Sequence, residues 1–224
     1  MEIIPKVHLI PGIIANPYLI IDQNGLTLID TGLPGSQRKI LRYINDLGYA
    51  PKGLRRIIIT HADIDHVGGL AALKSTTDAR LFSNVLEAEA IAKGHPSRQM
   101  KSANFINRLV YRLVGSLFKA RPVQVDEFLT EGEVLPVLGG LRVLDTPGHT
   151  PGHISLFAPE AGILFCGDSI VSEETGLRGS RGANTWDQAK ADESVRKQAI
   201  LGATILCSGH GPVVKDAAGK FPQV

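Results

Sequence analysis

The residues of this chain best suited to chemistry form one short cluster, His-Ala-Asp-Ile-Asp-His, at positions 61–66, directly after the apolar run 57–59. Imidazole and carboxylate groups are common protein ligands for transition metals, and all four polar residues of the cluster carry one. Alternate residues of an extended segment point the same way, so we expect His61, Asp63 and Asp65 to share one side. His66 would then point elsewhere. The cluster therefore predicts two metal centres rather than one.

Three other segments each place one ligand-type side chain in a small-residue turn after an apolar strand. Residues 145–149 end in His149, residues 165–168 end in Asp168, and residues 206–210 end in His210. The glycine next to each side chain lets the backbone turn sharply and approach an ion closely. Each turn alone is a weak signal, but together with positions 61–66 they bring candidate ligands to four strand ends. We expect His153 to support the site or to start a strand rather than to bind metal.

This arrangement resembles the metallo-β-lactamase superfamily, whose signature is a His-x-His-x-Asp-His loop followed by a histidine, an aspartate and a last histidine. The resemblance covers essentially the whole chain and includes the Asp-Thr-Gly turn at 30–32. It implies an α/β (α+β) fold, a four-layer αβ/βα sandwich of two mixed β-sheets flanked by helices. We expect residues 1–224 to form one such domain.

The resemblance also implies a role for each candidate ligand. The first metal ion would be held by His61, Asp63 and His149. The second would be held by Asp65, His66 and His210, and Asp168 would bridge the two ions. Asp30 would brace the metal-binding loop from behind. We further expect Asp65 and Asp168 to act in catalysis, by orienting a hydroxide and moving a proton.

One position departs from the commonest pattern of the superfamily, because Asp63 stands where the second histidine usually does. Three carboxylates and a hydroxide would cancel the charge of two divalent ions, which would make the bound water less acidic and favour harder ions. We expect zinc first. Iron or manganese is the alternative, because the superfamily's oxygen-reducing diiron proteins also place a carboxylate here.

A two-metal site of this kind activates a hydroxide and polarises the bond that is attacked. We therefore predict a dinuclear metallo-hydrolase acting on a small ester-like substrate, which could be a lactone, an ester or a thioester. A phosphodiesterase is the alternative among enzymes. Because one fold hosts many chemistries, a metal-loaded ligand-binding protein without catalysis and an iron redox protein are alternatives of another class.

The composition is that of an ordinary soluble globular protein. The chain has 224 residues, 43% of them hydrophobic and 21% charged, and its net charge of +2 gives no sign of nucleic-acid binding. Cys166 and Cys207 lie inside apolar runs, so we expect both to be buried and reduced. The N-terminal residues lack the pattern of a secretory signal, and no apolar run has the length to cross a bilayer. We expect a cytoplasmic enzyme with a small-molecule substrate.

Hydrophobic periodicity and turn residues predict the elements that must position these ligands. Residues 2–10 and 17–30 favour three strands, the last two joined at Asn24-Gly25. Helices are expected at 36–47, from 70, from an Asn84 cap to residue 92, and from an Asp187 cap to residue 201. Further strands are expected at 55–60, 80–83, 124–129, 141–145, 153–158, 162–166 and 204–207.

A basic amphipathic helical insertion is predicted at about 94–121. Six basic residues and no acid fall between Arg98 and Arg121, and apolar residues recur at every fourth position. This helix could cover the metal cleft and attract an anionic substrate, or one with an apolar tail, or it could bind a membrane surface. Its apolar stripe could equally pack on the sandwich or on the partner of a homodimer.

Overall fold

The first β-sheet of the computed structural model, which describes residues 1–98 and 120–224, contains seven strands in chain order. Neighbours from β1 to β4 are antiparallel, whereas those from β4 to β7 are parallel, so the sheet is mixed. The strands are β1 Glu2–Ile4, β2 Val7–Leu9, β3 Tyr18–Asp22, β4 Gly25–Ile29, β5 Leu54–Ile58, β6 Arg80–Ser83 and β7 Glu127–Phe128.

The second sheet is also mixed and has six strands in the order β15-β14-β11-β10-β9-β8. Only β11 and β14 run parallel; the other neighbours are antiparallel. Its strands are β8 Val134–Leu135, β9 Leu141–Asp145, β10 Ile154–Ala158, β11 Ile163–Gly167, β14 Ile205–Ser208 and β15 Val214–Lys215. A separate two-stranded ribbon consists of β12 Ile170–Glu173 and β13 Gly176–Gly179.

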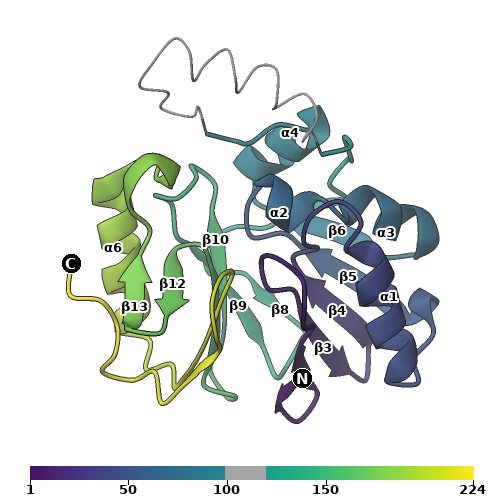
Figure 1. Ribbon diagram of the computed structural model, residues 1–224, viewed down its shortest axis with the longest axis horizontal. Coiled ribbons are helices and arrows are strands. Elements are labelled where there is room, and N and C mark those ends of the chain that lie inside the picture. The colour runs from purple at the N-terminus through teal and green to yellow at the C-terminus, as the bar shows by residue number, and fades with distance from the viewer. Residues whose placement is uncertain (99–119) are drawn as a thin grey trace.

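Helices cover the outer faces of the two sheets, as Figure 1 shows for α1 and α3 beside the first sheet and α6 beside the second. The helices are α1 Gln37–Asp46, α2 Ile64–Val67, α3 Leu70–Thr76, α4 Val85–Lys93 and α6 Gln188–Ala199. The predicted four-layer αβ/βα sandwich is confirmed. No helix in the two described ranges is long and apolar enough to cross a membrane.

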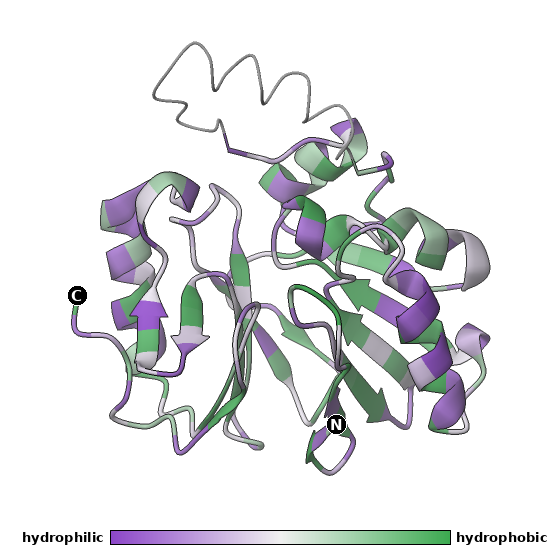
Figure 2. Ribbon diagram, viewed as in Figure 1, coloured by the Kyte–Doolittle hydropathy of each residue, from purple (hydrophilic) through white to green (hydrophobic). Residues whose placement is uncertain are grey.

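Strand alternation explains why the chain folds into four layers. Successive side chains of a strand face opposite sides of its sheet. In β5, Ile58 faces the core between the sheets while Ile57 packs under the helices of the first half. In β11, Phe165 faces the same central core while Leu164 packs on the α6 side. Figure 2 shows the resulting apolar strands and the more hydrophilic outer helices.

Most predicted elements agree with the structure, and the differences have local causes. The caps form as expected: the Asn84 side chain accepts a hydrogen bond from Leu86 N at 2.9 Å, and Asp187 accepts one from Lys190 N at 3.1 Å. Residues 2–10 make two strands rather than one, because Lys6 takes a positive φ of 69° and turns the chain. The strand expected at 124–129 is shortened to the two residues of β7, since the Asp126 side chain just before it accepts a hydrogen bond from Leu81 N of β6 at 2.6 Å.

The predicted basic helix falls almost entirely on residues 99–119, which lie outside the described residues. The described residues just before it, 94–98, form no helix. Gly94 takes a left-handed φ of 67° and ends α4. The prediction for residues 99–119 therefore stays a prediction. Arg98, by contrast, lies outside any helix, and its side chain contacts Asp63.

Candidate metal centre

The loop after β5 carries four of the predicted ligands, but it does not stay extended throughout. Asp63 is extended, with φ −71° and ψ 147°, and α2 begins at the next residue. Our expectation that Asp65 shares a side with His61 and Asp63 is therefore wrong, because the helical turn redirects it. Three side chains can contribute ligand atoms to each of two groups: His61, Asp63 and His149 in the first, and Asp65, His66 and His210 in the second. A third set, His61, His66 and Asp168, connects the two groups.

The ligand atoms of each group lie at the spacing that a shared ion would impose. In the first group, Asp63 Oδ2 lies 3.2 Å from His149 Nε2 and 3.6 Å from His61 Nε2. In the second, Asp65 Oδ2 lies 3.3 Å from His210 Nε2. Metal–ligand bonds of about 2.0–2.2 Å place neighbouring ligand atoms roughly 3 Å apart.

Asp168 lies between the two groups. Its Oδ1 is 3.4 Å from His66 Nε2, and its Oδ2 is 3.4 Å from His210 Nε2 and 3.6 Å from His149 Nε2. One carboxylate therefore faces histidines of both groups, as a bridging ligand would. Gly209 makes this position accessible, since a Cβ atom there would collide with Asp168 Oδ1.

Buried polar atoms without partners show that the site fits a cation. Among the described residues, His61 Nε2, His66 Nε2 and Asp168 Oδ1 are buried and have no hydrogen-bond partner. Buried polar atoms in proteins are nearly always paired, so each unpaired one needs an explanation. All three face the centre of the cluster, and a pair of divalent ions would satisfy them.

Asp30 holds the ligand loop from behind. Its Oδ2 lies 2.8 Å from His66 Nδ1 and also accepts a hydrogen bond from Thr60 Oγ1 at 2.8 Å, while Oδ1 accepts one from Thr60 N at 2.9 Å. Asp30 is 2% exposed and has a left-handed φ of 59°, so the backbone turns sharply to place it. The carboxylate fixes the His66 ring with Nε2 directed into the site, as support of this kind usually does.

His153 is buried, and both of its ring nitrogens have hydrogen-bond partners. Nδ1 lies 2.8 Å from Thr146 Oγ1, and Nε2 accepts a hydrogen bond from Asp168 N at 3.0 Å. Burial, together with the neighbouring His61 and His149, lowers the pKa of His153 well below its ordinary value, which keeps Nε2 free to accept. This residue therefore supports the Asp168 turn, as we expected.

Glu87 on α4 is a residue of the site that sequence reasoning missed. Its carboxylate is fully buried and accepts four hydrogen bonds. Oε2 accepts from Ala62 N at 2.8 Å, while Oε1 accepts from Thr150 Oγ1 at 2.7 Å, Gly152 N at 2.9 Å and Ser97 Oγ at 2.7 Å. Glu87 thus joins the loop at 61–66 to the turn that carries His149. A glutamate in the first turn of a helix has no distinctive sequence signal.

Arg98 is a second missed residue, and it enters the first ligand group directly. Its Nη1 donates to Asp63 Oδ1 at 2.9 Å, and its Nη2 lies 2.7 Å from Asp63 Oδ2. Nη1 also lies 3.3 Å from His149 Nε2. The Arg98 side chain is 8% exposed, so the ion pair is nearly buried.

The charges of the site shift the ionisation of its side chains. Burial raises the pKa of Asp63, but hydrogen bonds from His149 and His61 and the charges of His61 and Arg98 outweigh it and hold that pKa well below its usual range. Hydrogen bonds to Asp168 and Asp65 raise the pKa of His210 to about 9. The carboxylates therefore favour the charged forms of His66 and His210, whereas burial lowers the pKa of His149.

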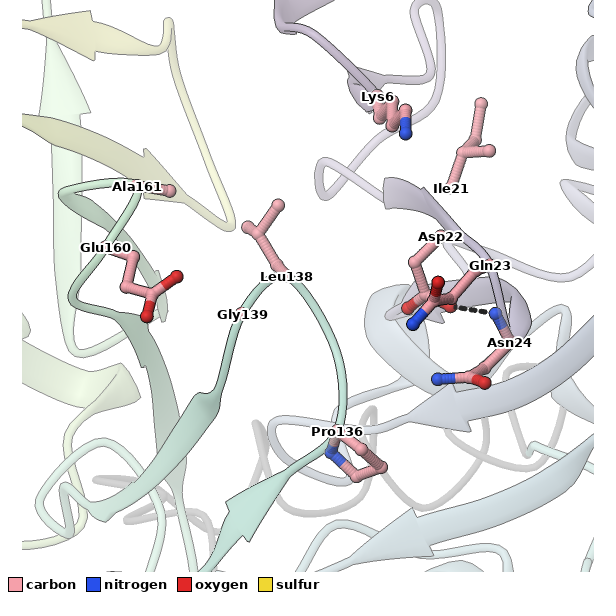
Figure 3. A pocket seen from close by; sticks show the side chains of 10 residues that line it. All are labelled: Lys6, Ile21, Asp22, Gln23, Asn24, Pro136, Leu138, Gly139, Glu160 and Ala161. Atoms are coloured by element: carbon pink, nitrogen blue, oxygen red, sulfur yellow. Dashed lines mark hydrogen bonds between the residues drawn. The ribbon is translucent and has the colours of Figure 1, made fainter.

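A separate groove of about 430 Å³ lies at the opposite end of the strands from the ligands. Figure 3 shows it between the β3–β4 turn, where Asn24 N donates to Asp22 Oδ1 at 2.7 Å, and the turns after β8 and β10. The ligand loop follows the other end of β5, which runs parallel to β4, and the ligand turns follow the other ends of β9, β11 and β14. The groove is lined by Lys6, Ile21, Asp22, Gln23, Asn24, Pro136, Leu138, Gly139, Glu160 and Ala161, and it is not part of the candidate metal centre.

Comparison with known proteins agrees with this geometry. Residues 10–210 match the sequence profile of the metallo-beta-lactamase superfamily. This chain belongs to that superfamily. The protein is 28% identical over 225 residues to the probable metallo-hydrolase YflN of Bacillus subtilis (strain 168), with 92% of this chain and 83% of the relative covered.

Two further similarities concern chemistry and metal. The chain is 28% identical over 197 residues to a hydroxyacylglutathione hydrolase of Albidiferax ferrireducens, which covers 86% of this chain but 60% of that enzyme. A crystal structure of TTHA1623 in a di-iron-bound form superimposes with a TM-score of 0.71 at 26% identity, covering 96% of this chain and 98% of that one.

Proposed function

We propose that this superfamily member is a dinuclear metal-dependent hydrolase acting on a small ester-like substrate, with esters, lactones and thioesters as candidate classes. The observation that carries the proposal is the convergence of seven imidazole and carboxylate side chains on one cluster, in two groups that a third set of His61, His66 and Asp168 connects. The ligands would be His61, Asp63, Asp65, His66, His149, Asp168 and His210.

Two ions bound there would supply a nucleophilic water at neutral pH and polarise the carbonyl of the substrate. The chain's own residues would orient that water and move its proton. Asp65 is suited to accept the proton, because its side chain is 25% exposed whereas that of Asp168 is 10% exposed. Asp168 would hold its position between the groups through the hydrogen bond from its backbone N to His153.

An acyl substrate is favoured over a phosphodiester by the similarity to a hydroxyacylglutathione hydrolase. That name states a thioester-type acyl substrate for the relative, and we extend only the bond class to this chain. The relative is longer, so the group attached to the acyl bond is not carried over with it.

Zinc remains the metal we propose first, because a set of four histidines and three aspartates suits it. The di-iron-bound structure of similar fold makes iron the leading alternative. Imidazole and carboxylate ligands accept both ions, so the identity of the metal depends on availability as much as on geometry.

The proposal is tested by elemental analysis followed by a substrate panel. Protein purified without added metal should contain close to two zinc or iron ions per chain, and one or none would contradict the dinuclear site. The holoprotein should then hydrolyse a chromogenic ester, lactone or thioester faster than bis-aryl phosphates. If the metal-containing protein hydrolyses none of them, the binding or redox alternatives replace this proposal.

A matched control separates the metal centre from the groove at the other end of the strands. Glu160→Ala changes a carboxylate that lines that groove. We expect this variant to retain both metal and activity, whereas His149→Ala should lose both. Loss of activity in the Glu160 variant would place the reaction elsewhere.

A further inference from the structure

The ion pair between Arg98 and Asp63 lies inside the first ligand group and needs an explanation of its own. Asp63 is the position where the superfamily's commonest pattern has a histidine, and Arg98 contacts both of its carboxylate oxygens at 2.9 and 2.7 Å. A two-point contact of this kind fixes the plane of the carboxylate as well as its charge. Arg98 follows α4, 35 residues after Asp63, so no local sequence pattern links them.

The two oxygens of Asp63 have different surroundings. Oδ2 faces the ligand atoms of His61 and His149 as well as Arg98 Nη2, whereas Oδ1 contacts Arg98 Nη1. The carboxylate can therefore give Oδ2 to an ion and keep Arg98 on Oδ1. Two contacts would have to lengthen, that of Nη2 with Oδ2 at 2.7 Å and that of Nη1 with His149 Nε2 at 3.3 Å.

The charge of the pair is the decisive quantity. A carboxylate and a guanidinium together carry no net charge, and neither does an imidazole. We propose that Asp63 and Arg98 act as one neutral unit that stands in for a histidine, so that the first metal position keeps the net ligand charge of a three-histidine site. Arg98 is then a positioning residue that also sets how strongly this position attracts a cation.

This inference revises the charge balance that the sequence suggests. Counting Asp63 alone makes the two-metal centre neutral, whereas counting Arg98 with it restores one positive charge. The pair also avoids the cost of an unpaired carboxylate in a site where the Asp63 side chain is 14% exposed. The preference for harder metal ions that Asp63 alone would cause is therefore weakened.

The inference rests on the proposed metal centre, and the experiment is chosen to test the two separately. In a His210→Ala background, which disables the second group, zinc affinity of the first group is measured by competition with a chromogenic chelator. Asp63→Ala should weaken binding strongly; unchanged binding would contradict the metal centre itself. The neutral-unit inference is tested by four further variants.

Those variants change the net ligand charge in both directions. Arg98→Met leaves the carboxylate uncompensated and should tighten zinc binding by roughly tenfold to a hundredfold, because a positive charge near the ion is removed. Asp63→His leaves the guanidinium uncompensated and should weaken binding by a similar factor. The double variant, Asp63→His with Arg98→Met, restores neutrality and should return the affinity to within about threefold of the parent. The zinc affinity of Arg98→Lys should stay nearer that of the parent than the affinity of Arg98→Met does.

Arg80→Met is the matched control, since Arg80 forms an exposed ion pair with Glu127 and should leave zinc affinity unchanged. If Arg98→Met leaves affinity unchanged or weakens it, Arg98 does not compensate Asp63 and the inference is overturned. Arg98→Lys behaving like Arg98→Met would also overturn it. These Arg98 variants retain the native ligands, so they test the inference even if Asp63→His does not fold.

Discussion

Asp168 differs from the other candidate ligands because it belongs to neither group and its carboxylate faces both. Its two oxygens lie within 3.6 Å of histidine nitrogens from the loop at 61–66, from the turn at 149 and from the turn at 210. Removing it would take away the carboxylate that lies 3.4 Å from His66 Nε2, an atom already without a hydrogen-bond partner among the described residues.

Asp168→Ala should therefore lose metal and activity together. We expect the metal content to fall to about one ion per chain or less and kcat/KM to fall by roughly a thousandfold or more, since the loss corresponds to several kcal/mol of charge stabilisation. Elemental analysis and initial rates measure both quantities on one preparation. A variant with two ions and normal rates would show that Asp168 does not bridge.

Gly209 matters because of the space that it leaves empty. An added Cβ would collide with Asp168 Oδ1 and crowd the His66 ring. Gly209→Ala should lower kcat by roughly a hundredfold, because displacement of reacting groups by about 1 Å has effects of that size. Gly202→Ala is the matched control, since a Cβ at Gly202 meets nothing within 4 Å, although its φ of 71° adds backbone strain. Equal activity of both variants would contradict the crowding argument.

At the scale of elements, α4 connects loops that are far apart in the sequence. The buried Glu87 carboxylate accepts hydrogen bonds from Ala62, Ser97, Thr150 and Gly152. These partners flank the first ligand group from both halves of the chain. A carboxylate is the only common side chain that accepts so many bonds while offering no donor.

Glu87→Gln should disturb this junction without changing its shape. The amide nitrogen would face a backbone or hydroxyl donor, so we expect metal affinity to fall roughly 10- to 100-fold and unfolding free energy to fall by about 1–3 kcal/mol. Zinc titration and thermal unfolding measure the two effects. Glu89→Gln, an exposed position on the same helix, is the control. If the two variants bind zinc equally, Glu87 does not position the site.

The sequence predicted those parts of the site that are local or belong to a recognisable motif. The cluster at 61–66 and the turns at 149, 168 and 210 are visible because ligand-type residues sit beside glycine after apolar strands. Glu87 and Arg98 were not predicted, because their contacts depend on how α4 and the residues after it pack against loops from elsewhere. Packing of that kind leaves no periodic signal in the chain.

The fold shows the same division between local and distant causes. Long periodic elements such as β3, β4 and α6 were predicted nearly to the residue, since caps and alternation determine them. The ribbon β12–β13 and the short strands β8 and β15 were missed, because two to four residues carry too little periodicity. The helical start at Ile64 was missed too, since nothing before it caps the helix with a side-chain bond.

At the scale of the whole molecule, the site joins the two halves of the sandwich. The Asn16 side chain donates to Ser208 O at 3.0 Å and to Gly211 O at 2.8 Å, and Tyr18 Oη donates to Ser208 O at 2.7 Å. Residues from β3 and from the loop before it therefore hold the turn that carries His210. The ligand loop at 61–66 comes from the first half and the three ligand turns from the second, so both halves must be folded together before the cluster is complete.

Protonation of this shared cluster links metal binding to the stability of the molecule. Hydrogen bonds to Asp168 and Asp65 raise the pKa of His210 from 6.5 to about 9, and the charges of Asp168 and Asp30 outweigh burial and raise that of His66 as well. A group whose pKa is higher in the folded than in the unfolded protein stabilises the fold fully at any pH below its unfolded-state pKa. That stabilisation is lost as the pH rises towards and through its folded-state pKa. Metal-free protein should therefore lose stability between about pH 6.5 and pH 9.

Holoprotein should show the opposite trend across that window, because a metal ion must displace these protons and binds better as they leave. We expect the difference in Tm between holoprotein and chelator-treated protein to widen steadily from pH 6.5 to pH 9, as measured by circular dichroism. His210→Gln has no proton to lose at that position and should flatten the metal-free curve in part. A metal-free Tm that rises with pH would contradict the assignment, since it would mean that the histidines are neutral in the folded protein and are not held charged by Asp65, Asp168 and Asp30.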